Sequence, residues 1–262
     1  MENLEILLLS IVQGISELLP ISSSGHLILL GRFLGLEIST LLLTTLHIGT
    51  SFAIIIFFRK RLFKNLFTKK KLIFYFKILV SIIPAAALGV LYESKIEQIL
   101  RFSWVIAISL IFWGILMIIA DFLKIEKRYK NVEDIPWKKT LIIGVSQIIA
   151  LIPGTSRSGI ATLTGITLGI DKYRAFEYSL ILGIPILLGS SIWEILKILV
   201  IEPTYTAELS PEFLLKLAIV IIVPFVVGYI SLLVLRQIKR EKWLTVFGIY
   251  RIILGVAILL FL

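Results

Sequence analysis

Glu17 lies near the end of a short apolar stretch, and Gln13 precedes it by four residues. Residues four apart lie on the same side of a helix, so the carboxylate and the amide face the same way. Carboxylate and amide oxygens suit hard cations, and we therefore expect Glu17 and Gln13 to hold a divalent cation, Mg²⁺ or Ca²⁺. The alternative is a carboxylate at a helix end that is exposed to water.

A second polar stretch, PGTSRSG at 153–159, places Arg157 between two serines. The planar fork of a guanidinium matches phosphate oxygens, and a Gly/Ser-rich turn that opens into a helix offers free N–H groups. These features predict a phosphate cradle, although Arg157 could instead tie two polar segments together. The residues expected to bind substrate are Ser22, Ser24, Gly154, Thr155, Ser156, Ser158 and Gly159.

His26 ends the stretch PISSSGH and could act as an acid, a base or a nucleophile, because histidine titrates near neutral pH. A buried structural histidine is an equally good interpretation. The hydroxyls of Ser22, Ser23 and Ser24 are candidate nucleophiles if a base deprotonates them. Consecutive serines at a helix start are also ordinary capping residues.

Two further ionisable residues lie inside apolar segments. For His47 a structural role is favoured, whereas Arg251 needs an acidic or a carbonyl partner that the sequence does not identify. An arginine, a carboxylate, a histidine and several hydroxyls together suggest an anionic, phosphorylated substrate. A cation that bridges diphosphate oxygens would neutralise the charge that develops in phosphoryl transfer.

The composition indicates that these residues lie in a membrane protein. Of 262 residues, 58% are hydrophobic and 17% are charged, whereas soluble domains are about half apolar and a quarter charged. Cysteine is absent, which excludes disulfides and thiolate chemistry. The net charge of +10 is concentrated in loops without a nucleic-acid-binding motif, so nucleic acid is not an expected partner.

Six segments are long enough to cross a bilayer core of about 30 Å. Two others, 6–19 and 140–152, are apolar but cover only about 20 Å each at the helical rise. Each is followed by a Pro- and Gly-containing polar turn and a further short apolar run, which predicts two re-entrant helical hairpins. The six predicted spans are 38–58, 72–92, 102–123, 178–201, 213–235 and 243–262.

The loop charges support this arrangement through the positive-inside rule. Nineteen Lys and Arg residues fall in the four loops assigned to the cytoplasm, and two fall in the loops assigned to the outside. Both termini are then expected on the outer face. The inside loops are 59–71, 124–139, 171–177 and 236–242, and the outside loops are 93–101 and 202–212.

An internal repeat divides this single membrane domain into 1–123 and 140–262. A shift of 134 residues places 10–36 on 144–170 with nine identical positions, and Gly49 meets Gly183. Each half has one hairpin and three spans, so the two halves have opposite orientation. Inverted repeats place a polar site near the midplane, lined by broken helices, and we expect the two polar turns to meet there.

The stretches QGISELLPISSSGH (13–26), PGTSRSG (153–159) and RAFEYSLILGIP (174–185) resemble the signature segments of the bacterial undecaprenyl-diphosphate phosphatases, the bacitracin resistance proteins. The resemblance covers essentially the whole chain. It implies a divalent-cation-dependent enzyme that hydrolyses undecaprenyl diphosphate to the monophosphate. This reaction recycles the carrier lipid for peptidoglycan synthesis.

The resemblance also implies roles for individual residues. The family's first motif is Glu or Gln, three residues, then Glu; here Gln13 takes the first position, so only Glu17 is charged. The family's serine, histidine and arginine correspond to Ser23, His26 and Arg157. Ser23 is the expected nucleophile and His26 the proton shuttle, although attack by His26 or by water stays open.

The resemblance further implies a place in the cell and a set of partners. We expect a multi-pass protein of the bacterial plasma membrane whose site opens to the outer face. A polyprenyl diphosphate and membrane lipid are expected partners, and a second copy of the chain is a candidate one. The competing interpretation is a lipid or anion transporter, or flippase, that uses the same midplane site.

Overall fold

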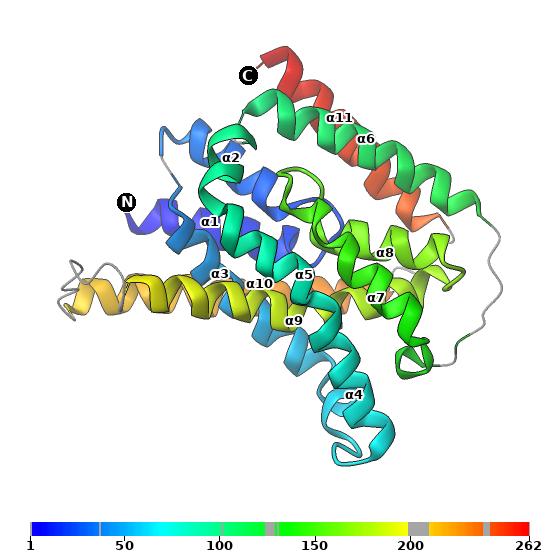
Figure 1. The fold of residues 1–262 in the computed structure, drawn as a ribbon. Helices are drawn as coiled ribbons and strands as arrows, with labels where there is room; N and C mark the ends of the chain where they lie inside the picture. The colour runs from blue at the N-terminus through cyan, green and yellow to red at the C-terminus, as the bar shows by residue number, and fades with distance from the viewer. Residues whose placement is uncertain are drawn as a thin grey trace. The chain divides into compact units, whose positions relative to one another are not determined.

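A computed structural model describes residues 2–36, 38–100, 102–123, 129, 131–198, 210–237 and 242–261, without the side chains of 93–100. Every regular element in these ranges is a helix, and six helices are long and apolar enough to cross a membrane (Figure 1). The fold is that of an all-α polytopic membrane protein. The six are α3 Thr40–Phe57, α5 Lys69–Leu100, α6 Ser103–Phe122, α9 Lys172–Leu196, α10 Pro211–Gln237 and α11 Trp243–Phe261.

All six predicted spans are therefore confirmed, but the predicted loops 59–71, 93–101 and 171–177 are largely helical, the first because it holds the short helix Arg59–Phe63 and the start of α5. Helix α9 begins at Lys172, within the predicted loop 171–177, and α5 continues to Leu100 through most of the predicted loop 93–101. The charges at the start of α9 have partners: Lys172 Nζ lies 2.7 Å from Asp121 Oδ1, and Arg174 pairs with Glu177 at 2.6 Å. The pairing of Arg174 with Glu177 one turn later stabilises the helix locally, and Asp121 satisfies the charge of Lys172.

The two predicted hairpins are helix–turn–helix segments. Each has a helix before and a helix after its polar turn, and the longest of these four has 14 residues. At the helical rise such a helix covers about 20 Å, less than a bilayer core. The four are α1 Asn3–Ser16, α2 Ser23–Phe33, α7 Trp137–Ser146 and α8 Arg157–Thr167; the remaining helices are α4 Arg59–Phe63, η1 Val132–Asp134 and η2 Ile149–Leu151.

Backbone conformation repeats with the same shift of 134 residues. Ser22 and Ser156 both have φ 74°, a value that non-glycine residues rarely adopt, and each stands directly before a helix. Gly35 and Gly169 also share a positive φ, 68° and 76°, after the second helix of each hairpin. Each pair occupies positions related by the 134-residue shift, and the division into two inverted repeats stays a prediction.

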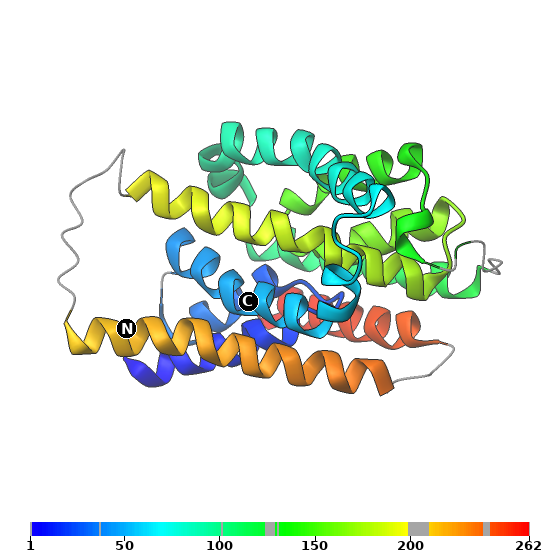
Figure 2. The same cartoon turned by 90° about the horizontal axis from the view of Figure 1, so that it is seen from below.

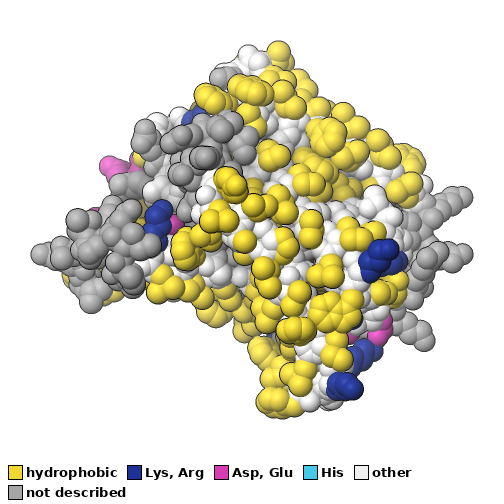
Figure 3. Space-filling model, viewed as in Figure 1, with side chains coloured by type: hydrophobic (Ala, Val, Ile, Leu, Met, Phe, Trp, Pro, Cys, Tyr) yellow, Lys and Arg dark blue, Asp and Glu magenta, His cyan; other side chains and the backbone are white. Residues whose placement is uncertain are grey.

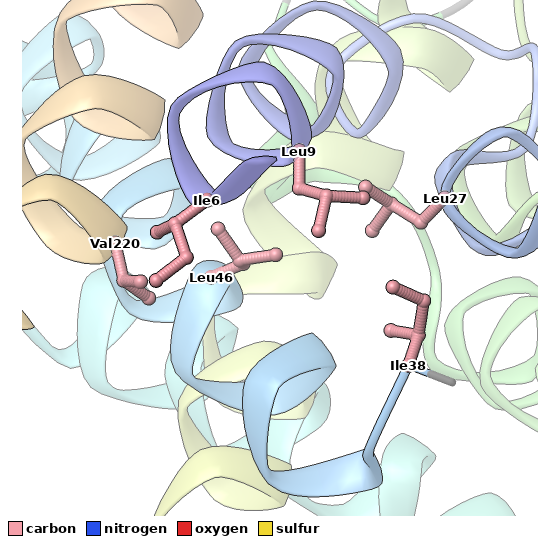
Figure 4. Close-up of a cluster of buried hydrophobic side chains, with 6 residues drawn as sticks. All are labelled: Ile6, Leu9, Leu27, Ile38, Leu46 and Val220. Atoms are coloured by element: carbon pink, nitrogen blue, oxygen red, sulfur yellow. The ribbon is translucent and has the colours of Figure 1, made fainter. Parts of the chain in front are cut away.

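The chain forms two compact units, and each is assembled from segments that are separated in sequence. One unit comprises Met1–Leu18, Ser23–Phe58 and Ile184–Gln237. Within it α10 packs along α3 and α1, as Figure 2 shows. A buried apolar cluster joins α1, α2, α3 and α10 (Figure 4) and consists of Ile6, Leu9, Leu27, Ile38, Leu46 and Val220.

The other unit comprises Leu19–Ser22, Arg59–Gly183 and Ile238–Leu262. Its α6 and α11 run side by side (Figure 1), and they approach closely at Gly114 and Gly248. A Cβ atom added to Gly248 would lie 2.6 Å from the carbonyl oxygen of Gly114. Small residues allow such backbone approach between helices in membranes, and these two glycines are related by the repeat.

The outer faces of the spanning helices are apolar. On α10 the side chains of Ile222, Val226, Ile230 and Val234 are exposed at four-residue spacing, which makes one continuous apolar stripe. Figure 3 shows one face of the molecule on which hydrophobic side chains predominate. Such a surface suits lipid rather than water. Much of the predicted loops 124–139, 202–212 and 236–242 lies outside the described residues.

Candidate active site

Glu17 follows the last residue of α1, and its carboxylate is the centre of a polar cluster in the first unit. The residue is 6% exposed, so the predicted alternative of a water-exposed carboxylate is wrong. Gln13 Nε2 donates to Glu17 Oε2 at 3.3 Å from one helical turn earlier. The Ser23 hydroxyl, at the start of α2, donates a short hydrogen bond to the same oxygen. The hairpin turn thus brings its two helix ends to one carboxylate.

His47 of α3 also faces this carboxylate. Its Nε2 atom lies 3.7 Å from Glu17 Oε2. His47 is therefore part of the polar cluster and does not only pack in the helix interior. Sequence reasoning favoured a structural role for it, because no local pattern links residues 30 positions apart. His26 lies on α2 three residues after Ser23, on the same side of that helix, and is partly exposed.

The cluster contains a buried oxygen atom that can serve a cation. Gln13 is fully buried, and within the described part of the chain its Oε1 atom accepts no hydrogen bond. A buried carbonyl oxygen without a donor is costly, and a hard cation would satisfy it. The described residues contain no group of three or more His, Cys, Asp or Glu side chains suited to a metal. Gln13 and Glu17 therefore fit a hard cation, which Gln13 Oε1 and the Glu17 carboxylate would hold.

The second unit holds the polar turn that precedes α8, residues 153–156. It also holds Leu19–Ser22, the start of the polar turn of the first hairpin, and the two segments are in contact. Ser156 Oγ accepts a hydrogen bond from Gly159 N–H at 3.2 Å and so caps α8. Ser158 Oγ donates to the carbonyl oxygen of Leu19 at 3.3 Å. The two polar turns therefore meet, as the repeat predicts.

Arg251 is the residue that joins the two turns. It is fully buried in α11, and its Nη1 donates to Pro20 O at 3.0 Å. Its Nη2 donates to Gly154 O at 2.6 Å and to Thr155 O at 3.0 Å. The partner that the sequence left open is thus a set of backbone carbonyls, and we call this contact the Arg251 clamp.

Gly154 and Thr155 are held from a second side as well. The hydroxyls of Thr155 and Ser109 lie 3.2 Å apart. Gly154 has φ +89°, and a Cβ atom there would lie 2.7 Å from the carbonyl oxygen of Ile106 on α6. These contacts fix the turn itself, and the substrate-binding role expected for Gly154 and Thr155 stays a prediction.

Arg157 is the first residue of α8 and is partly buried. Its Nη1 donates to the carbonyl oxygen of Ser179 on α9 at 3.1 Å. Arg251 joins the two turns, and the alternative in which Arg157 also ties polar segments together is not tested by this contact. Arg157 is held against α9 at the N-terminal end of α8, where the helix start presents the positive end of its dipole.

The chain matches the family model described as Bacitracin resistance protein BacA over residues 6–257. A curated relative from Pseudoalteromonas translucida, named Undecaprenyl-diphosphatase 1, is 36% identical over 279 residues, which cover 100% of this chain and 99% of the relative. A relative of the same name from Clostridioides difficile is 35% identical and covers 99% of this chain and 96% of its own length. The Undecaprenyl-diphosphatase of Methanococcus aeolicus is 32% identical, with 100% and 99% covered. The protein therefore belongs to the BacA family of bacitracin resistance proteins.

Proposed function

We propose that the protein is an integral-membrane enzyme that hydrolyses undecaprenyl diphosphate to undecaprenyl phosphate and inorganic phosphate. Its family and the printed names of its relatives support this activity. A substrate with a long lipid tail suits a chain with six apolar spans and an apolar outer surface. The reaction recycles the carrier lipid for cell-wall synthesis.

The hydrogen bond from the Ser23 hydroxyl to the Glu17 carboxylate carries the chemical proposal. A carboxylate that accepts this bond is placed to take the proton when the serine oxygen becomes a nucleophile. The Ser23 oxygen bonds to the terminal phosphorus, and the bond from that phosphorus to the bridging oxygen breaks. Undecaprenyl phosphate leaves with the bonding electrons, and the hydroxyl proton goes to Glu17.

Water completes the reaction. It attacks the phosphorus of phosphoserine, the bond to the Ser23 oxygen breaks, and inorganic phosphate leaves. The proton of the water goes to His26, which lies on the same helical face as Ser23, and Ser23 regains its proton from Glu17. Direct attack by His26 or by water would leave no phosphoserine.

Arg157 and the amides that open α8 are the proposed phosphate-binding groups. The guanidinium supplies a bidentate fork for the diphosphate oxygens, and the helix start supplies N–H donors and a positive dipole end. Ser156 and Ser158, which lie beside each other at 3.3 Å, contribute hydroxyls at the same helix start. This assignment rests on the chemistry of the donors.

Mg²⁺ or Ca²⁺ is the proposed cofactor, held by Gln13 Oε1 and the Glu17 carboxylate. When bound, the cation neutralises charge on the diphosphate oxygens. The buried Gln13 oxygen without a donor supports this placement. Glu17 must be ionised both to bind a cation and to accept the proton of Ser23.

The test is phosphate release from farnesyl or undecaprenyl diphosphate by detergent-purified protein, with Mg²⁺, with Ca²⁺ or with EDTA. We expect release that depends on the cation and is lost in Glu17→Ala and in Arg157→Ala. Detergent removes the compartments that transport requires, so release there identifies an enzyme. Absence of release from folded protein with every cation would contradict the proposal and favour a flippase, to be tested by lipid flipping in vesicles.

The site and both chain termini are proposed to face the outside of the bacterial plasma membrane, on the basis of the loop charges. The chain has no cysteine, so single cysteines can report topology. A cysteine at Glu2 should react with a membrane-impermeant thiol reagent in intact cells. A cysteine at Lys60 should react only after permeabilisation, and the reverse pattern would overturn the orientation.

A further inference from the structure

Gly183 of α9 lies directly against the guanidinium of Arg157. A Cβ atom added to Gly183 would lie 1.8 Å from Arg157 Nη1, 2.4 Å from Cζ and 2.7 Å from Nη2. All three distances are well inside van der Waals contact. The guanidinium therefore occupies the space that any other residue at position 183 would need.

The same helix holds this guanidinium one turn earlier. Arg157 Nη1 donates to the carbonyl oxygen of Ser179, four residues before Gly183. Residues four apart lie one above the other on one side of a helix. Ser179 O and the bare backbone at Gly183 together make a notch in α9, which fixes both the position and the plane of the Arg157 fork.

The repeat provides a contrast with the equivalent glycine. Gly49 of α3 corresponds to Gly183, but a Cβ atom at Gly49 would meet backbone: Ile221 O at 2.3 Å and Phe225 N at 3.0 Å. Gly49 thus permits the close approach of α3 and α10. The backbone atoms of α10 that a Cβ would meet cannot move without shifting the packed helix. At Gly183 the obstructed atoms belong to the end of a long side chain, which can move while the backbone stays in place.

We propose that Gly183 is a positioning residue for Arg157, which keeps the guanidinium fork in the orientation that binds the diphosphate. The inference rests on the proposed function, in which Arg157 is a phosphate ligand. A preorganised fork loses less freedom on binding and meets the transition state without rearrangement. Alanine at position 183 would displace the fork from the notch and leave the fold intact.

The experiment compares Gly183→Ala with Gly189→Ala, a matched change on the same helix where an added Cβ meets nothing within 4 Å. Phosphate release from farnesyl diphosphate gives kcat and KM, and detergent thermal unfolding gives Tm. We expect Gly183→Ala to lower kcat/KM about 100-fold, the usual consequence of misplacing a binding group by about 1 Å. Its Tm should stay at the wild-type value, and Gly189→Ala should match wild type in both measurements.

Dependence on Arg157 separates positioning from a general structural effect. Lysine lacks the Cζ, Nη1 and Nη2 atoms that conflict with a Cβ at position 183. In an Arg157→Lys background we therefore expect Gly183→Ala to change kcat/KM by less than about twofold, because the two changes remove the same interaction. A residue that acts independently of Arg157 would instead reduce activity by the same factor in both backgrounds.

The outcomes distinguish the two proposals. If Arg157→Ala is inactive while Gly183→Ala is as active as wild type, Arg157 keeps its phosphate-binding role, and the positioning role of Gly183 is refuted. An undiminished effect of Gly183→Ala in the Arg157→Lys background would also refute it. If Arg157→Ala retains wild-type kcat/KM, the phosphate-binding role of Arg157 fails, and the positioning role of Gly183 fails with it.

Discussion

Arg251 Nη2 lies 2.6 Å from the carbonyl oxygen of Gly154, and Nη1 of the same guanidinium lies 3.0 Å from that of Pro20. One buried side chain of the last helix thereby joins the polar turns of both hairpins, which are 134 residues apart in sequence. Because its partners are backbone carbonyls, the clamp uses none of the side chains of the turns. The clamp therefore fixes the turns without using the groups expected to do chemistry.

Arg251→Lys should lower both Tm and activity. A single ammonium cannot span the four carbonyl oxygens that the guanidinium reaches, those of Pro20, Leu110, Gly154 and Thr155. Each buried acceptor that loses its donor costs about 1–3 kcal/mol. Thermal unfolding in detergent and phosphate release measure the two effects. Arg236→Lys, an exposed change near the end of α10, is the control that should match wild type. Wild-type Tm and turnover in Arg251→Lys would show that the clamp is dispensable.

Ser23→Ala should abolish turnover and Glu17→Gln should reduce it by about 10²- to 10⁴-fold, the range for loss of a general base. The second substitution keeps the size of the side chain but removes its charge, so the fold should be retained. Quenching wild-type turnover with SDS at neutral pH, on substrate labelled at the terminal phosphorus, preserves both phosphoserine and phosphohistidine and should show the label on Ser23. Label on His26 would assign the nucleophile to the histidine and contradict the proposed roles.

The spans and hairpins were predictable because their signals are local. A run of apolar residues shows its own length. The turns before Ser23 and Arg157 both contain Pro and Ser, and the second also contains Gly, residues that favour turns over helix interiors. The start of α9 at Lys172 was not predictable from the same signals. Its charge is satisfied by Asp121, which is 51 residues away and leaves no trace in the local pattern.

The sequence indicates which residues form the site better than it indicates which of them are in contact. Gln13, Glu17 and Ser23 lie within one hairpin, so their spacing already indicates that they can meet. His47 reaches Glu17 only through the packing of α3, and the carbonyl partners of Arg251 have no sequence signature at all. The repeated glycine at positions 49 and 183 was visible, but its two roles differ because different neighbours lie against it.

Glu133→Gln should destabilise the protein at neutral pH and have little effect in acid. Burial raises the pKa of Glu133, but the hydrogen bond and charge of Lys71, with the charge of Arg61, outweigh it and hold the pKa below its ordinary value. The stabilisation is present above the unfolded pKa of about 4.3 and is lost as pH falls through the lower folded pKa. The Tm difference from wild type should therefore shrink as pH falls below about 4.

Asp134→Asn is the matched control for that pH series. A hydrogen bond from Lys70 holds the pKa of Asp134 below its ordinary value as well, but this pair is more exposed. Exposed pairs contribute about 0–1 kcal/mol, so the Tm change at pH 7 should be smaller than for Glu133→Gln. A Glu133→Gln effect that stays constant from pH 7 to strong acid would show that the stabilisation is not ionic.

Gly248→Ala should separate α6 from α11 and lower Tm. The new methyl group would lie 2.6 Å from Gly114 O, a backbone atom that can move only with its helix, and overpacking of this kind costs about 1–3 kcal/mol. Arg251 lies one turn later on α11, so a displaced helix also moves the clamp and turnover should fall with Tm. Gly89→Ala, where the nearest atom is Leu151 Cδ2 at 3.6 Å, is the matched change without a close backbone contact and should be neutral. Equal Tm values for the two variants would mean that the paired glycines do not set the approach of these helices.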